Sequence, residues 1–162
     1  MTINGWTIYA HPLFLGQLAN LIAGVEADKQ RDAKNYKTKA NAKLLKAVYT
    51  IALERIPHDP TDKRYRLGDT LGDSYKHWFR DKFGNGRFRL FFRYDSKSKI
   101  IIYSWINDET TLRTRGSKTD AYAIFASMLA SGNPPDSWDA LLAACKKPET
   151  VKRAKEILAK KD

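Results

Sequence analysis

Two amphipathic helices are predicted in the first third of the chain, because apolar residues recur there every three or four positions. The first helix begins at His11-Pro12, and its apolar face extends to Val25. The polar stretch 28–37 is expected to form a loop. The second helix carries its apolar face along residues 44–56, and the proline-containing segment 57–60 is expected to end it.

In the middle of the chain the apolar period changes from helical to two residues, which is typical of half-buried β-strands. Three strands are predicted, at residues 78–83, 87–94 and 99–105. Two short turns join them, at residues 84–86 and 95–98, and both contain residues that tolerate positive φ. The three strands are therefore expected to form an antiparallel meander. A further short strand is predicted at residues 6–9.

The last third of the chain is predicted to be helical. Asp120 is a suitable N-cap for a helix that carries an apolar stripe, and Gly132 is expected to stop that helix. Two more helical stretches follow, around residues 138–142 and from residue 149 onward. The expected fold is α+β: a small twisted antiparallel sheet packed against two N-terminal helices, with C-terminal helices. Residues 1–145 are expected to form one domain, and residues 146–162 a basic helical tail.

The net charge indicates what kind of partner the protein binds. The 162 residues carry 29 Lys+Arg against 18 Asp+Glu, a net charge of +11 that predicts an anionic partner, most often nucleic acid. Hydrophobic residues make up 43% of the chain, which excludes a disordered basic tail. The single cysteine, Cys145, excludes an internal disulfide. Without a signal peptide or a membrane-spanning run, the protein is expected to be cytoplasmic.

Most of the positive charge falls on the predicted sheet and the loop after it. Residues 76–118 contain eleven basic and four acidic residues, a net charge of +7. Along strand 87–94 the positions alternate, so Arg87, Arg89 and Arg93 share one face and apolar residues the other. Arg80 and Lys82 of the preceding strand are expected beside them, and this face is expected to meet phosphate. The alternative is a basic surface balanced by acids from elsewhere in the fold.

If the anionic partner is RNA, its cleavage needs neither a metal nor a cofactor, because the ribose 2′-OH can attack the adjacent phosphate. Cations then stabilise the crowded phosphorane, and a side chain takes the 2′-OH proton. Tyr122, which follows a basic loop, is a candidate for that base or a core aromatic. Asp108-Glu109 is a weak magnesium motif, and His11 and His58 are expected to be structural or exposed. His77, next to the basic strand, is a candidate for RNA contact.

Three long strings of the sequence resemble the YhaV toxins, of the RelE-like superfamily of bacterial type II toxins. They are NGWTIYAHP, KFGNGRFRLFFRY, and WINDETTLRTRGSKTDAY followed by GNPPDSW. The resemblance covers about residues 4–138 and implies a RelE-like fold and an endoribonuclease that cleaves mRNA and arrests translation and growth, acting on the ribosome. It also implies a PrlF-like antitoxin with a swapped-hairpin DNA-binding domain, through which the complex would bind operator DNA.

The same resemblance implies which residues act. The basic pair is Arg80 and Lys82, the arginine of the next strand is Arg89, and the tyrosine is Tyr122. The loop arginine is Arg115, with Arg113 as second choice.

In the resulting hypothesis Lys82 or Tyr122 takes the 2′-OH proton, Arg89 and Arg115 stabilise the phosphorane, and Arg80 positions the phosphate or helps protonate the leaving group. The remaining candidates are expected to hold RNA: Arg87, Arg93, Arg113, Lys118 and His77. Two functions from other classes stay open: a basic nucleic-acid-binding regulator without chemistry, and an inhibitor that blocks the ribosome without cutting.

Overall fold

The computed structural model describes residues 1–159 and contains one five-stranded sheet. Its strands lie in the order β1-β2-β5-β4-β3. Their bounds are Thr2–Ile3 for β1, Trp6–Ala10 for β2, Phe79–Phe83 for β3, Phe88–Asp95 for β4 and Ile100–Ile106 for β5. The α+β class is confirmed, and the three strands of the predicted meander are correct to within one residue at each end.

The sheet is mixed, so the prediction of a purely antiparallel sheet is wrong. Strand β2 runs parallel to β5, with Thr7 opposite Ile100 and Ala10 opposite Tyr103. A parallel pair needs a long crossover between its strands. Here the segment between β2 and β5, which contains the N-terminal helices, β3 and β4, forms this crossover. The sequence pattern does not show which strand β2 pairs with. The two-residue strand β1 pairs antiparallel with β2 and is too short for a periodic signal.

The two N-terminal helices are present, but their ends differ from the prediction. Helix α1 spans Pro12–Arg31 and extends four residues into the segment predicted as a loop. Helix α2 spans Ala40–Thr50 and continues through a π-helical turn, Ile51–Arg55, into the short helix α3, Ile56–His58. Pro57, which is predicted from the sequence to end the helix, therefore lies inside its last turn. Proline has no backbone N–H to donate, and Pro57 comes shortly after the π-helical turn, where the regular α-helical hydrogen bonds are already replaced by wider ones.

Three helices follow the sheet, at Ala121–Ala130 for α4, Trp138–Lys146 for α5 and Pro148–Leu158 for α6. Asp120 caps α4 as predicted. Single 3₁₀ turns lie at Tyr36–Thr38, Lys63–Tyr65 and Asp73–Tyr75. In the described part of the chain, no helix has both the length and the apolar character needed to cross a membrane.

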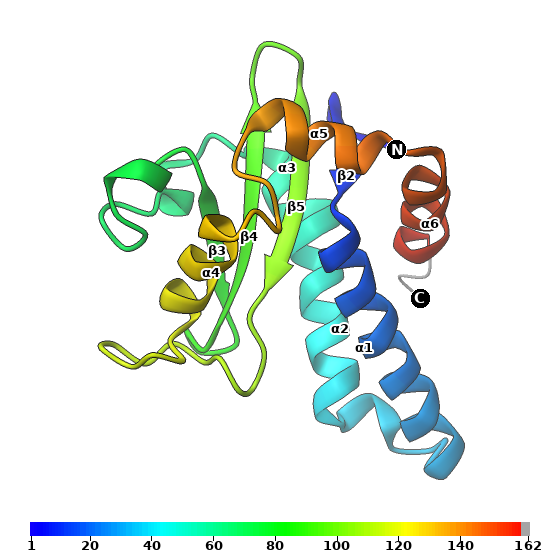
Figure 1. Ribbon diagram of the computed structural model, residues 1–162. Coiled ribbons are helices and arrows are strands. Elements are labelled where there is room, and N and C mark those ends of the chain that lie inside the picture. Colours follow the sequence, from blue (N-terminus) through cyan, green and yellow to red (C-terminus); the bar gives the residue numbers. More distant parts are fainter. Residues whose placement is uncertain (160–162) are drawn as a thin grey trace.

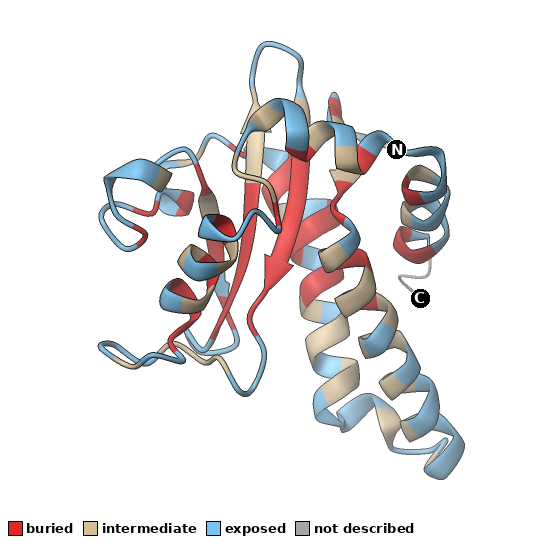
Figure 2. Cartoon of the chain, in the orientation of Figure 1, coloured by how far each residue is buried: buried red, intermediate tan, exposed pale blue. Residues whose placement is uncertain are grey.

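Helices cover both faces of the sheet, which gives three layers (Figure 1). One hydrophobic core joins α1, α2 and α6 to the face that carries Phe88, Leu90 and Phe92. A second core joins α4 and α5 to the opposite face, where Phe91 is fully buried. The buried colour of β4 and β5 in Figure 2 reflects this double coverage. Helices α4 and α5 lie over the sheet face that carries Arg89 and Arg93, so both arginines are at least partly covered.

The predicted tail packs against the rest of the chain over its described part. Ile157 and Leu158 of α6 belong to the first core, and the Tyr49 hydroxyl donates to the Ile157 carbonyl at 2.8 Å. Residues 160–162 of the predicted tail lie outside the described residues. The boundary at residue 145 stays a prediction.

Candidate active site

The phenol of Tyr122 lies at the centre of the basic residues. The Arg80 Nε donates to the Tyr122 Oη at 2.9 Å, and the Arg89 Nε donates to the same oxygen at 3.0 Å. Arg80 and Arg89 come from adjacent antiparallel strands, β3 and β4, and Tyr122 lies in the first turn of α4. The face that α4 covers is therefore the face that carries the two arginines.

Both guanidinium groups are fixed by additional hydrogen bonds. The Arg80 Nη1 donates to the Arg64 carbonyl at 3.0 Å, and the Arg89 Nη1 donates to the Gly86 carbonyl of the β3–β4 turn. Arg80 is only 7% exposed and Arg89 5% exposed. Within residues 1–159 neither Nη2 group makes a hydrogen bond, so each arginine keeps donors for a substrate phosphate.

A third arginine reaches the same tyrosine from the loop between β5 and α4. The Arg113 guanidinium lies 4.7 Å from the centre of the Tyr122 ring, and the Arg89 guanidinium lies 5.4 Å from it. Asp120, the N-cap of α4, forms an ion pair with Arg113, in which the Arg113 Nη1 and the Asp120 Oδ1 are 2.7 Å apart. Asp120 also accepts from the Thr114 backbone at 2.6 Å, so one carboxylate ties the loop to the helix that carries Tyr122.

This surrounding charge changes the acidity of the tyrosine. Burial alone would raise the pKa of Tyr122, but the hydrogen bonds from Arg89 and Arg80 and their positive charges outweigh it. The net effect lowers the pKa below its ordinary value of 10.0. A buried phenol with a lowered pKa and two cationic donors is suited to accept a proton or to stabilise a nearby developing negative charge.

Asn107 also shapes the site, and sequence reasoning missed it. Its Oδ1 accepts from the Arg89 backbone N–H at 2.6 Å, and its Nδ2 donates to the carbonyls of Arg87 and Thr111. Asn107 is only 2% exposed, and it joins the start of β4 to the loop that carries Arg113. An asparagine directly after an apolar strand is the one sequence signal that would have indicated this role.

Four of the other predicted residues are exposed, and their side chains make no hydrogen bond to this buried cluster in residues 1–159. Lys82 on β3 is exposed and pairs in register with Arg89. Arg87 and Arg115 are exposed, so the loop arginine at the tyrosine is the second choice, Arg113, and not Arg115. Lys118 lines an open depression of about 500 Å³, which Arg113 and Tyr122 also line.

His77 and Arg93 do not join the cluster. Arg93 lies four positions beyond Arg89, about 13 Å along the strand. It lies over the Trp78 and Trp138 rings, at 5.5 and 5.3 Å, and donates to the Asp136 carbonyl. The His77 Nε2 makes a hydrogen bond with the Asp136 Oδ1 at 2.6 Å.

Metal ligands are a separate question from the arginine cluster. Within residues 1–159, no three His, Cys, Asp or Glu side chains gather where they would hold a metal ion. Asp108, of the weak magnesium motif, instead accepts hydrogen bonds from Thr110 and Thr111 in its own loop.

Comparison with known proteins relates this site to a family. A family model described as a toxin with endonuclease activity, of a toxin-antitoxin system, matches residues 8–146. The chain belongs to the YhaV toxin family. The chain is 50% identical over 140 residues to Toxin YhaV of Escherichia coli O6:H1 (strain CFT073), which covers 86% of this chain and 91% of that relative. It is 49% identical, over the same shares, to Ribonuclease toxin YhaV of Escherichia coli K12.

Nearly all the residues described above fall within the matched part of the chain. Arg80, Arg89, Asn107, Arg113 and Tyr122 all lie between residues 8 and 146. The resemblance seen in the sequence is thereby confirmed at the level of the YhaV toxin family. No solved structure matches the chain.

Proposed function

We propose that this YhaV-family toxin is an endoribonuclease that cleaves mRNA without a metal ion, through the cluster around Tyr122. The observation that carries the proposal is the pair of arginine Nε donors, at 2.9 and 3.0 Å, on one buried phenol oxygen. Tyr122 accepts the 2′-OH proton, since the two guanidinium groups favour its ionised form. The released 2′-oxygen attacks the adjacent phosphorus, and the 5′-oxygen leaves, which produces a 2′,3′-cyclic phosphate.

The arginines supply the electrostatic part of this mechanism. The Nη2 groups of Arg80 and Arg89 bind the phosphate oxygens, and Arg113 adds positive charge at the same point. Lys82, exposed beside Arg89, protonates the leaving 5′-oxygen. Arg87, Arg115 and Lys118 hold the flanking RNA. We assign to Arg113 the loop position for which the family resemblance implied Arg115 first, because Arg113 contacts the Tyr122 ring.

The wider proposal follows the family. The toxin acts on ribosome-associated mRNA in the cytoplasm, has a RelE-like arrangement, and is silenced by a PrlF-like antitoxin, through which alone it reaches operator DNA. Primer extension on translated and untranslated copies of one message tests whether cleavage depends on the ribosome. Cleavage restricted to the translated copy supports this role, and equal cleavage of both copies contradicts it.

The chemical proposal is tested on the purified protein with RNA in excess chelator. We expect cleaved RNA with 2′,3′-cyclic phosphate ends, and strong losses of cleavage and of growth arrest in the Arg80→Ala, Lys82→Ala and Arg89→Ala variants. Arg153→Ala, an exposed position on α6, is the matched control and is expected to cleave normally. Intact RNA that is tightly bound would instead indicate a regulator without chemistry. If the three site variants fold and remain fully toxic, the site assignment is wrong.

A further inference from the structure

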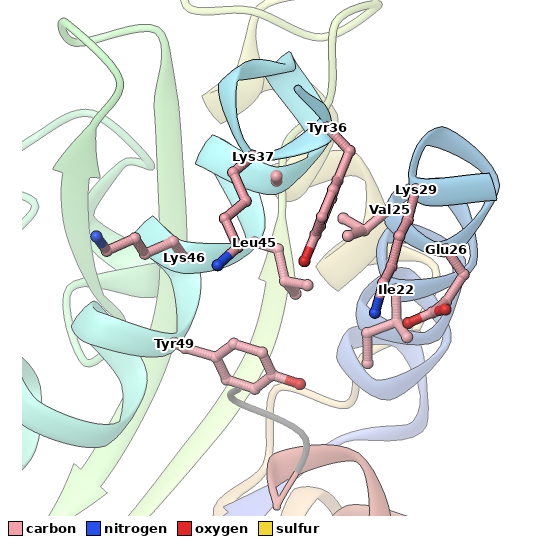
Figure 3. Close-up of a pocket in the computed structure, with 10 residues that line it drawn as sticks. Ile22, Val25, Glu26, Lys29, Tyr36, Lys37, Leu45, Lys46 and Tyr49 are labelled. Atoms are coloured by element: carbon pink, nitrogen blue, oxygen red, sulfur yellow. The ribbon is translucent and has the colours of Figure 1, made fainter. Parts of the chain in front are cut away.

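The structure contains a second feature that the RNA-cleaving site does not use: a groove of about 660 Å³ between α1 and α2 (Figure 3). This volume lies within the range of roughly 300–1,000 Å³ that is usual for binding pockets. The first core joins α1 and α2 to the sheet, whereas Tyr122 packs in the second core on the opposite face. An occupant of the groove would therefore not contact the catalytic cluster.

The groove is lined by apolar side chains that the fold leaves partly exposed. Ile22 and Val25 of α1 and Ala42 and Leu45 of α2 lie along it, and all four are only partly buried. The outer ends of α1 and α2 project beyond the sheet and are largely exposed or intermediate in Figure 2. Ile22 and Leu45 pack against the first core, yet none of the four side chains is fully buried, so a partner in the groove would bury them further.

Three lysines frame the apolar lining. Lys29 of α1, Lys37 of the 3₁₀ turn and Lys46 of α2 are exposed and line the groove, against one acidic lining residue, Glu26. Residues 22–49 carry seven basic and three acidic residues in all. Lysines beside an aliphatic surface fit a ligand that has both apolar and negatively charged groups.

We propose that this groove binds an acidic amphipathic helix of the antitoxin. The inference rests on the proposed function, because a toxin of this kind acts with an antitoxin. A helix that places apolar residues at i, i+3, i+4 and i+7 matches a groove between two helices, and acidic flanks match the three lysines. RNA fits less well, because of the two lining tyrosines Tyr49 is buried and Tyr36 lies under Lys29, and the remaining apolar lining is aliphatic and offers bases no stacking surface.

The experiment measures antitoxin affinity and RNA cleavage in parallel on the full chain. Lys29→Glu/Lys46→Glu reverses two charges at the groove, and Ala42→Phe fills it without removing a core side chain. We expect each variant to weaken the binding of the purified antitoxin at least tenfold, with RNA cleavage within twofold of the unmodified toxin. Lys34→Glu/Lys43→Glu changes the net charge equally at exposed positions that do not line the groove, and it should change antitoxin affinity less than threefold.

Two results would overturn the proposal. One is unchanged antitoxin affinity in both groove variants. The other is a loss of RNA cleavage in Lys29→Glu/Lys46→Glu with antitoxin binding intact, which would assign the groove to RNA. An unmodified toxin that binds antitoxin but cuts no RNA would refute the proposed function and leave the groove measurement valid.

Discussion

At the scale of single residues, the candidate site consists of a few buried polar groups whose partners come from distant parts of the chain. Tyr122 receives Arg80 from 42 positions away and Arg89 from 33. A buried phenol normally resists ionisation, and here two guanidinium donors reverse that tendency. His11 shows the opposite case, because burial without a charged partner keeps its ring neutral.

The role proposed for Tyr122 predicts a particular pH profile. If its phenolate takes the 2′-OH proton, cleavage rises with pH through a pKa that lies below the ordinary value of 10.0. Tyr122→Phe should lower the cleavage rate by about 10²- to 10⁴-fold and remove that rising limb. Single-turnover cleavage across the pH range gives the profile, and thermal unfolding checks that the variant folds. A Tyr122→Phe protein that cleaves at the normal rate would exclude Tyr122 as the base.

His11 predicts how stability depends on acid. Burial lowers the pKa of His11 from 6.5 to about 4, and its Nδ1 accepts the Leu13 N–H at the start of α1. The unfolded chain therefore binds a proton at His11 as the pH falls through 6.5, whereas the folded chain binds it only near pH 4. Stability is complete above that pH and falls as the pH drops toward 4, by about 2 kcal/mol at pH 5.

Denaturant unfolding at pH 7 and pH 5 measures this loss. His11→Asn keeps an N-cap acceptor that does not titrate, so its loss between these pH values should be smaller by nearly that amount. The same pH dependence in His11→Asn and the unmodified chain would show that His11 is not its source.

At the scale of elements, the β3–β4 hairpin connects the turn to the site. Its turn residues Gly84, Asn85 and Gly86 all have positive φ, and the Gly86 carbonyl holds Arg89. The short turn keeps β3 and β4 in the register that places Arg80 and Arg89 on one face. The conformation of three turn residues therefore sets the position of the two arginines that contact Tyr122.

Two glycines in this turn should differ in their tolerance of alanine. A Cβ at Gly84 would lie 2.7 Å from the Phe88 ring, whereas one at Gly86 would meet open space. Gly86→Ala should therefore cost only the left-handed conformation, about 1–2 kcal/mol, and Gly84→Ala about 2–4 kcal/mol because Phe88 must also move. Denaturant unfolding of both variants measures the difference, and equal losses would contradict the contact.

At the scale of the whole molecule, one sheet carries a separate hydrophobic core on each face, so the groove and the arginine cluster lie in different parts of the fold. The groove lies between α1 and α2, which cover one face, and the arginines that contact Tyr122 lie on the face under α4. Helices α5 and α6 continue the chain past Tyr122 and close over β2, where Cys145 is buried.

The labelling rate of the Cys145 thiol tests whether α5 and α6 detach from β2 without unfolding of the rest of the protein. Burial raises the pKa of its thiol to about 12, and the side chain is 1% exposed. We expect a disulfide reagent at pH 8 to modify native protein only as fast as the whole molecule unfolds. The reaction is followed by thiolate release and compared with the global unfolding rate, with Cys145→Ser as the blank. Much faster labelling would show that α5 and α6 detach while the rest stays folded.

Local pattern accounts for a large part of this protein. The three strands of the meander, both turns, the Asp120 cap and the candidates Arg80, Arg89 and Tyr122 follow from periodicity, turn residues, charge and family resemblance. Periodicity succeeds there because each strand buries one face and each turn needs positive φ. The sequence by itself therefore determined the elements and the basic character of the site.

Only the tertiary structure decided how those parts meet. Strand β2 joins β5 in parallel and α4 covers the arginine face, since both depend on contacts between distant segments. The same packing places Arg113, and not Arg115, against the Tyr122 ring, and it brings Asn107 to the backbone of Arg89. It also brings Arg93 and His77 to Asp136, away from Tyr122. Periodicity reports which face of an element is apolar and not which segment covers it, so the pairing of a buried polar group stays hidden until the chain is folded.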